Sequence, residues 1–320
     1  MVTATVLGGT TGLGKATIDA LISQNINTKA LVNDIEYFKR MYPDKLPGKV
    51  TLYPGDMDNN EAISAACEDT DIIYFCVDLP YQDWKRKMNV YITKTVYVAE
   101  ALEARIVYPG NMYTYGKIDA AQLPLTEEAP QTPNTEYGQL SVAIENRLMK
   151  AAMDGAELTI IRLPFIYGPA ILDPLMQAVF LSAIRGSATS WYGDPDLPQQ
   201  FIYVEQVGKI LAEAGLNAET ADTIIHAGAI EPITPREWLE KIYELAGSEC
   251  RITQPSTWML YLKSVFNRDV LQFIDLKSRF DQSMILDDEK YNLLMDQDYL
   301  GTATDGIEDT INWFRYWFEI

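Results

Sequence analysis

Short apolar runs alternate with amphipathic, helix-like segments through the first half of the chain. Runs rich in β-branched and aliphatic residues predict strands at 3–7, 29–32, 50–53, 71–76, 105–108 and 158–162. Segments in which apolar residues recur with helical spacing predict helices at 15–23, 61–67, 84–104 and 137–152. This alternation is typical of a parallel sheet covered by helices on both faces, because parallel strands need long, right-handed crossover connections.

The alternation loosens after about residue 165. Helix-like segments are expected at 173–185, 205–216 and 235–245, separated by loops rich in Pro, Gly and Asp, and a last amphipathic helix at 306–318 would dock on the rest of the protein. We therefore predict an α/β fold. It would consist of a Rossmann-type doubly wound parallel sheet over residues 1–165 and a smaller C-terminal α/β lobe over residues 166–320, with excursions of the chain between the two.

The composition narrows the classes of partner. Apolar residues make up 48% of the 320, enough for a sizeable core, and the net charge is −19 with a pI near 4.4. Nothing so acidic neutralises phosphates over an extended surface, so no nucleic acid partner is expected. The chain opens directly into a strand and has no apolar run of membrane-spanning length, so we expect no membrane association and a cytoplasmic location.

Cysteine and histidine usage argues against a metal site. Cys67, Cys76 and Cys250 are widely spaced and form no C-x-x-C pair, which indicates neither zinc nor a disulfide framework and fits a reducing compartment. His226 is the only histidine, so a Ser-His-Asp triad would depend on it. It lies in an expected strand, where a structural role is the more common one.

A glycine-rich turn joins the first expected strand to the first expected helix. Glycine permits a tight turn and lets the backbone approach a phosphate, and a helix N-terminus favours an anion. The spacing G-x-x-x-G-x-G departs from G-x-G-x-x-G, but its place between strand and helix predicts a dinucleotide-binding turn. The residues expected to hold the pyrophosphate are Gly8, Thr10, Thr11, Gly12, Leu13 and Gly14.

The residues about 20 positions further on are expected to contact the adenosine ribose. Asn33 holds that position and Asp34 follows it. An acid there favours the 2′-hydroxyl of NAD, whereas an arginine favours the 2′-phosphate of NADP. Lys39 and Arg40 are close in sequence. The predicted cofactor is therefore NAD(P), with a slight preference for NAD.

Further motifs, in a consistent order along the chain, resemble those of one family. They are Gly55-Asp56-Met57, Phe75-Cys76-Val77, Tyr115-Gly116, Tyr137-Gly138 with Glu145, R-L-P-F-I-Y-G-P at 162–169 and F-I-Y-V at 201–204. Together they make the chain similar to the short-chain dehydrogenase/reductases, in an atypical branch of their extended, nucleotide-sugar-epimerase-like kind. The resemblance implies that Asp56 and Met57 lie at the adenine, that Cys76 and Val77 lie along the cofactor, and that the C-terminal lobe binds the substrate.

The chain departs from this family's pattern where the catalytic residues are expected. The resemblance implies a catalytic set of Tyr137, Asn111 and Ser141, in which Asn111 replaces the family's Ser or Thr and Ser141 replaces its Lys. Gln199 replaces the Arg that grips a nucleotide-sugar diphosphate, and Gln206 replaces the Asp that follows in the family. The polar groups that recognise a nucleotide sugar are thus changed.

Tyr137 would be the acid of this set. Tyr137 and Ser141 are four residues apart and share a helix face, where the family places a cation beneath its phenol. Without that cation the phenol should stay neutral at pH 7, so it can donate a proton but is a poor base. Asn111 can still hydrogen-bond a substrate oxygen through its amide. Reduction by NAD(P)H is therefore favoured over the oxidise-and-reduce cycle of an epimerase.

The substrate pocket is expected to be apolar. If the family geometry holds, Met112, Tyr113 and Phe165 line it, and Phe165 stands where the family often has Asn. The spare cations nearest to Tyr137 in sequence, Lys94 and Lys117, are expected to be solvated surface residues.

The first functional hypothesis is an NAD(P)-dependent oxidoreductase of a small, fairly apolar carbonyl or enone. The alternative is a non-catalytic NAD(P)-binding sensor or regulatory protein, because both Ser and Lys are missing. A nucleotide-sugar epimerase or dehydratase ranks third, since Met112 and Tyr113 stand where dehydratases carry their acid pair. The resemblance also implies a homodimer that pairs through the helices at 84–104 and 137–152.

Overall fold

The computed structural model describes residues 2–42, 49–228, 230–256, 258, 260, 271–296 and 301–320. Within these residues seven parallel strands form one sheet in the order β10-β6-β5-β4-β1-β2-β3. The strands are β1 (Thr3–Leu7), β2 (Asn27–Val32), β3 (Val50–Pro54), β4 (Ile72–Phe75), β5 (Arg105–Asn111), β6 (Leu158–Leu163) and β10 (Thr223–His226). The predicted Rossmann-type doubly wound sheet is confirmed.

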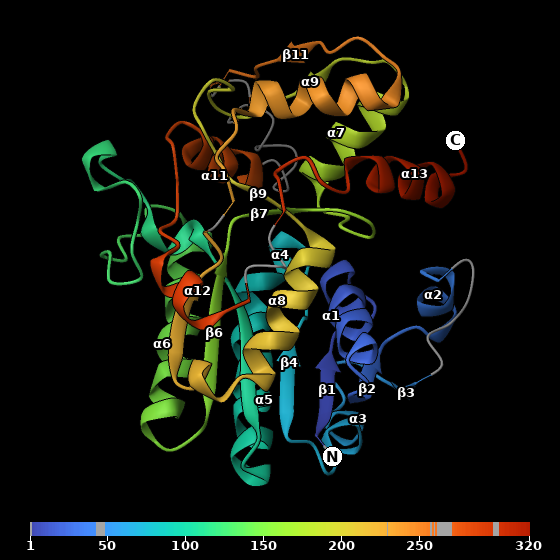
Figure 1. Ribbon diagram of the computed structural model, residues 1–320, viewed down its shortest axis with the longest axis vertical. Helices are drawn as coiled ribbons and strands as arrows, with labels where there is room; N and C mark the ends of the chain where they lie inside the picture. The colour runs from blue at the N-terminus through green and yellow to red at the C-terminus, as the bar shows by residue number, and fades with distance from the viewer. Residues whose placement is uncertain are drawn as a thin grey trace.

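Helices cover both faces of this sheet (Figure 1). Alternate residues of β1 show why: Ala4 and Val6 pack with α1 and α8 in one core cluster, whereas Leu7 packs with α3, α5 and α6 in a second. The helices of this part are α1 (Gly12–Ser23), α2 (Ile35–Arg40), α3 (Asn60–Cys67), α4 (Tyr81–Asp83), α5 (Asn89–Leu102), α6 (Glu136–Met153) and α8 (Val204–Leu216), with short helical turns η2 (Met112–Tyr115), η3 (Ala120–Gln122) and η4 (Ala218–Thr220).

The predicted elements differ from the observed ones mainly at their ends. α1 begins at Gly12 because the side chain of Thr11 caps it, and the unpredicted helix α2 begins after Asp34, which caps it in the same way. The segment predicted as one helix over 84–104 is instead a π-helical turn, η1 (Trp84–Met88), followed by α5.

The second lobe lies above the carboxyl ends of the parallel strands (Figure 1). It contains two small sheets, in which β7 (Phe165–Tyr167) pairs with β9 (Phe201–Tyr203) and β8 (Thr189–Ser190) pairs with β11 (Ile252–Thr253). Its helices are α7 (Pro174–Ile184), α9 (Pro235–Ala246), α11 (Leu271–Phe280), α12 (Glu289–Leu294) and α13 (Ile307–Phe318). Stacked aromatic rings fill its core, among them Phe201 on Trp238 at 4.2 Å between ring centroids.

The chain crosses between the two parts more than once. After β9 it returns to the large sheet through α8 and β10, and α8 packs against α1. The domain boundary at residue 165 therefore stays a prediction, because α8 and β10 follow it in sequence but pack with the first part.

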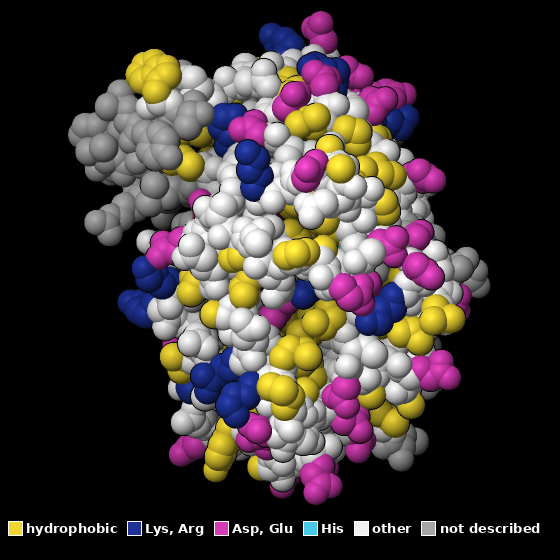
Figure 2. All heavy atoms as spheres, turned by 90° about the vertical axis from the view of Figure 1, so that its left-hand side faces the viewer, with side chains coloured by type: hydrophobic (Ala, Val, Ile, Leu, Met, Phe, Trp, Pro, Cys, Tyr) yellow, Lys and Arg dark blue, Asp and Glu magenta, His cyan; other side chains and the backbone are white. Residues whose placement is uncertain are grey.

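The helices that the resemblance assigns to a dimer interface carry exposed apolar side chains. Val90 and Tyr97 on α5, and Met149 and Met153 on α6, are exposed. The homodimer stays a prediction. The face shown in Figure 2 mixes apolar side chains with both signs of charge. No helix in the described ranges is long and apolar enough to span a membrane.

Candidate active site

The glycine-rich turn lies at the carboxyl end of β1 and has the backbone that a phosphate site needs. Gly8 has a φ of +90°, and a Cβ on it would lie 2.6 Å from the carbonyl oxygen of Cys76, so only glycine fits there. The hydroxyl of Thr11 accepts a hydrogen bond from the amide of Gly14 at 2.9 Å and donates to the carbonyl of Cys76 at 2.9 Å. The turn is thereby fastened to the end of β4.

Two backbone donors at the start of α1 are left for a ligand. The amides of Gly12 and Leu13 make no hydrogen bond to any other residue that the structure describes. Ala170, in the loop after β7, covers Gly12 so closely that a Cβ there would lie 2.7 Å from the Ala170 carbonyl oxygen. Free amides at a helix N-terminus are suited to a pyrophosphate, and the glycines of the turn leave room for it to approach. The turn therefore fits a dinucleotide.

The predicted adenosine corner consists of Asn33, Asp34, Asp56 and Met57. Hydrogen bonds of the first three side chains hold it together. Thr10 donates its hydroxyl hydrogen to Asn33 Oδ1 at 2.6 Å, and Asp34 Oδ1 accepts the amide of Tyr37 at 2.9 Å. Asp56, after β3, accepts the amide of Asp58 at 2.9 Å. Met57 is buried.

Cys76 and Val77 follow β4 beside the glycine-rich turn. Burial raises the pKa of the Cys76 thiol to about 12, so it is a neutral packing group rather than a nucleophile. Asp78 comes next. Its side chain is partly open to solvent, and the protein atoms around the carboxyl group desolvate it and raise its pKa. The indole of Trp84 donates a hydrogen bond to the Asp78 carboxylate.

A second carboxylate faces the same region from the other side. Asp173 follows the loop that covers Gly12 and caps α7 by accepting the amides of Leu175 and Met176 at 3.0 and 3.1 Å. Burial, together with the charge of Asp78, raises its pKa to about 7. Sequence reasoning missed both acids, although Asp78 directly follows the predicted Cys76-Val77 segment.

The three predicted catalytic residues are brought together at the carboxyl end of β5. Asn111 Nδ2 donates to Ser141 Oγ at 3.1 Å, and Ser141 Oγ donates to the carbonyl oxygen of Tyr137 at 3.0 Å. The amide of Tyr113 donates to Asn111 Oδ1 at 3.0 Å, which fixes which end of the Asn111 amide points at Ser141. Ser141 is buried, at 1% exposure. The position of the family's lysine is thus filled by a neutral hydrogen-bonded pair.

Two aromatic rings pack against the phenol of Tyr137. Its ring centroid lies 4.4 Å from that of Trp84 and 4.9 Å from that of Tyr113. Lys94 donates to the carbonyl of Met57 at 2.8 Å, and Lys117 is exposed. Lys117 is thus the surface residue that was expected, whereas Lys94 is half-buried and holds the backbone at Met57.

The residues predicted to line the substrate pocket lie close together, beside one buried cation. Met112 is buried, and the rings of Tyr113 and Phe165 meet edge to face at 6.5 Å. The Arg279 guanidinium, from α11, lies 4.8 Å over the Phe165 ring and donates to Gln199 Oε1 at 2.9 Å. Its Nε is buried without a hydrogen-bond partner among the described residues, and burial lowers its pKa to about 9.

A small cavity of about 10 Å³ adjoins this guanidinium. It is lined by Met112, Tyr113, Gly116, Asn134, Thr135, Asp275, Ser278, Arg279 and Met284. Nothing in the local sequence identifies Arg279, because it comes from a helix of the second lobe far from the predicted motifs.

His226 is a structural residue, as predicted. It is fully buried, donates through Nδ1 to the Leu125 carbonyl at 3.0 Å, and accepts the Tyr115 hydroxyl at Nε2. Arg162 donates to the same hydroxyl and forms a buried ion pair with Glu145 at 2.8 Å. These contacts join β10, β6 and α6 behind the predicted catalytic residues.

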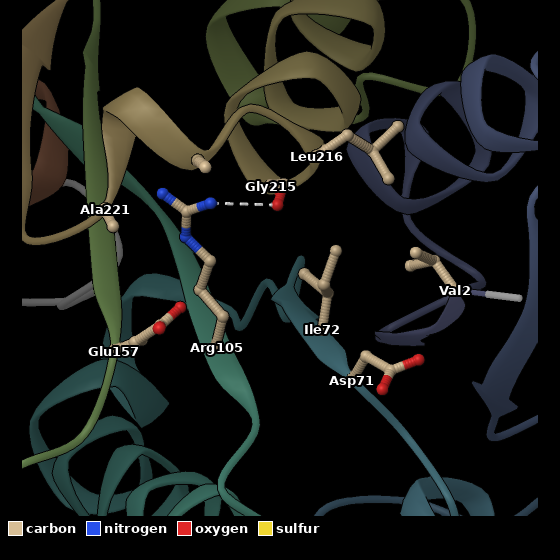
Figure 3. Close-up of a pocket in the computed structure, with 9 residues that line it drawn as sticks. Val2, Asp71, Ile72, Arg105, Glu157, Gly215, Leu216 and Ala221 are labelled. Carbon is tan, nitrogen blue, oxygen red and sulfur yellow. Dashed lines mark hydrogen bonds between the residues drawn. The ribbon is translucent and has the colours of Figure 1, made fainter.

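The larger described cavity, of about 390 Å³, lies at the opposite edge of the sheet (Figure 3). Its one guanidinium, Arg105, donates to the carbonyls of Gly215 and Asn217 at 3.0 and 2.7 Å. Arg105 thus satisfies the carboxyl end of α8, and its guanidinium is already engaged by the protein.

Residues 4–228 match the NAD dependent epimerase/dehydratase family. The chain belongs to this family. The match runs from β1 to the residues just after β10 and includes the glycine-rich turn, Asn111 and Tyr137, so the predicted resemblance is confirmed. The family depends on NAD, which confirms the cofactor and the preference for NAD over NADP. No metal is indicated, and the described residues hold no cluster of three or more His, Cys, Asp or Glu suited to one.

Solved structures of other proteins share the family fold over almost the whole chain. An epimerase from Methanothermobacter thermautotrophicus aligns with a TM-score of 0.81 at 17% identity, covering 99% of this chain and 93% of its own. A dTDP-glucose 4,6-dehydratase from Bacillus anthracis, solved with NAD, aligns at 0.77 and 14%, covering 98% and 97%. A UDP-glucose 4-epimerase from Thermus thermophilus, also with NAD, aligns at 0.74 and 18%, covering 98% and 99%. No curated protein matches the chain in sequence.

Proposed function

We propose that this protein is an NAD-dependent oxidoreductase that acts on a nucleotide sugar. The observation that carries the proposal is Arg279. The family's diphosphate-binding Arg is replaced by Gln199, yet the Arg279 guanidinium lies 2.9 Å from that glutamine's side-chain oxygen. A cation thus stands beside the position of the missing one, supplied by a different element.

The guanidinium is poised for an oxyanion. It lies over the Phe165 ring at 4% exposure, and its Nε has no hydrogen-bond acceptor among the described residues. Leaving a buried charged donor unpaired is unfavourable, and a phosphate or carboxylate oxygen would remove that penalty. A small apolar carbonyl compound, the first hypothesis from the sequence, would leave the donor unpaired, so it is the weaker candidate.

The remaining polar residues have assignable roles. NAD, when bound in its reduced form, would supply the hydride, and the amides of Gly12 and Leu13 would hold its pyrophosphate. The neutral Tyr137 hydroxyl would donate its proton to the keto oxygen of the sugar as that carbonyl is reduced. Asn111, whose amide is oriented by Ser141 and by the Tyr113 amide, offers its second Nδ2 hydrogen to the same oxygen.

The alternative is a protein that binds NAD without turnover. Its support is the Asn111–Ser141 hydrogen bond, which joins the two replaced catalytic residues to each other. Under this alternative the pocket would still bind a nucleotide, but no hydride would be transferred.

Arg279→Met tests the proposal, with the exposed Arg147→Met as the matched control. We expect UDP- and dTDP-sugars to bind the wild type in calorimetric titrations, and Arg279→Met to weaken that binding at least about tenfold, the loss of a charge-assisted hydrogen bond. Because Arg279 donates to Gln199 and forms no ion pair within the described part, the variant should fold. Equal binding by both variants, or turnover of small ketones with no affinity for any nucleotide sugar, would contradict the proposal. Binding without turnover would favour the alternative.

A further inference from the structure

The last helix of the second lobe packs against the adenosine corner of the first. The Arg40 guanidinium, at the end of α2, lies 4.2 Å over the Trp317 ring and donates to the Trp317 carbonyl oxygen at 2.7 Å. The Tyr37 ring meets Trp317 edge to face at 5.0 Å, and the Tyr316 hydroxyl donates to the Arg40 carbonyl at 3.3 Å. These contacts join segments 277 residues apart.

The position of Trp317 is set by the second lobe. Phe314, on the same helix, stacks on Phe180 of α7 at 5.4 Å, and Arg315 donates to the Ala246 carbonyl at the end of α9 at 3.3 Å. Ile307 and Ile311 are buried on the same face of α13. Because α13 is held by α7 and α9, Trp317 presents a fixed ring and a fixed carbonyl to Arg40.

Arg40 is one of the cations near the place where NAD and NADP differ. α2 begins at the ribose-contacting corner, and its six residues span roughly 9 Å at 1.5 Å per residue, so a long side chain at its end can turn back toward a 2′-phosphate. Lys39 pairs with Glu36 at 2.7 Å, and Lys15 with Asp19 at 2.7 Å. Both are thus neutralised by acids, whereas Arg40 is held by a ring and a carbonyl that leave its charge intact.

We propose that Trp317 determines cofactor specificity by holding Arg40 away from the 2′ position of the adenosine ribose. The proposal rests on NAD binding at the glycine-rich turn and makes no use of the sugar site. With Arg40 held on Trp317, the acidic side chain of Asp34 dominates the ribose corner and disfavours a 2′-phosphate. Without Trp317, the Arg40 guanidinium becomes available as a phosphate ligand.

Trp317→Ala tests this, with the dissociation constants of NAD⁺ and NADP⁺ measured by calorimetry in the absence of sugar. An exposed cation–π contact is worth about 0.5–1 kcal/mol, so the NADP⁺ affinity should rise about two- to fivefold while the NAD⁺ affinity stays within about twofold. The matched control is Phe318→Ala, in the same helical turn, whose ring stacks on Phe314 rather than on Arg40. The control should leave both constants unchanged.

A double variant separates the role of Arg40 from a general loosening of α13. Adding Arg40→Ala to Trp317→Ala should abolish the gain in NADP⁺ affinity. An unchanged NADP⁺ constant in Trp317→Ala, equal changes for both cofactors, or a gain that survives in the double variant would each overturn the proposal. Any of these results would leave the proposed function untouched, because that proposal is tested by the binding of nucleotide sugars to the Arg279 variant.

Discussion

The side-chain amide of Asn111 donates to the hydroxyl of Ser141 at 3.1 Å. These are the two positions at which the chain departs from its family's Ser and Lys, and they have become hydrogen-bond partners. Ser141 also donates to the backbone of its own helix at Tyr137. The replacement is therefore a coupled one: a neutral pair that orients an amide has taken the place of a hydroxyl and a cation.

Ser141→Ala should disturb this pair without emptying the core. It removes the acceptor of Asn111 Nδ2 in a site of 1% exposure, so we expect a loss of about 1 kcal/mol in the free energy of unfolding, measured by urea titration. Turnover of a nucleotide sugar should fall as well, because Asn111 loses its orientation. Ser187→Ala, on an exposed loop, is the control. Unchanged stability and turnover in Ser141→Ala would show that the pair is dispensable.

Glu145→Gln should destabilise the protein far more than the loss of a surface ion pair. Glu145 and Arg162 are each buried and lie 2.8 Å apart, so the variant leaves a buried guanidinium without a counter-charge. The expected loss is about 3–5 kcal/mol in the urea titration. Asp154→Asn removes the exposed pair with Lys150 at the end of the same helix and should leave the midpoint nearly unchanged. Similar losses in the two variants would refute this difference.

His226 should stay neutral throughout the stable pH range. Burial, with the charge of Arg162, lowers its pKa to about 3, whereas an unfolded histidine titrates near 6.5. Below about pH 6.5 the unfolded chain takes up a proton that the native state does not, so stability should fall as pH falls from there toward 3. Because the chain has one histidine, its imidazole NMR signals need no assignment. A shift with a midpoint near 6.5 in the folded protein would contradict the buried, neutral ring.

Asp173→Asn should stabilise the protein by an amount that grows as pH rises from about 4 to about 7. Burial and the neighbouring Asp78 raise the Asp173 pKa to about 7 from a usual 3.8. Between these values the native state binds a proton that the unfolded chain has released, so this group makes stability fall as pH rises toward 7. Asparagine keeps the helix cap and removes the charge. The melting temperature should exceed that of the wild type at about pH 8 and equal it near pH 4. The same increment at both values would point to packing instead of charge.

Much of the fold follows from local patterns in the sequence. The strand at Thr3–Leu7 is followed directly by the glycine-rich turn and by the helix that Thr11 caps. The turn needs glycine and the cap needs a hydroxyl, so the residue types predict both. The proximity of Tyr137 and Ser141 follows likewise from helical periodicity, and their approach to Asn111 was expected from the family motifs. The sequence alone thus determined the sheet and the glycine-rich turn, and it predicted which residues meet at the end of β5.

Tertiary structure alone decided which distant groups share a site. Arg279 and Gln199 are 80 residues apart in sequence, and Arg40 and Trp317 are 277 apart. No local sequence pattern predicts that either pair is in contact. Periodicity records which side of an element is buried, but not which other element covers it. That depends on how the crossover connections and the second lobe pack above the sheet. The cation beside the predicted substrate pocket and the ring that contacts Arg40 could therefore be identified only from the positions of α11 and α13 in the fold.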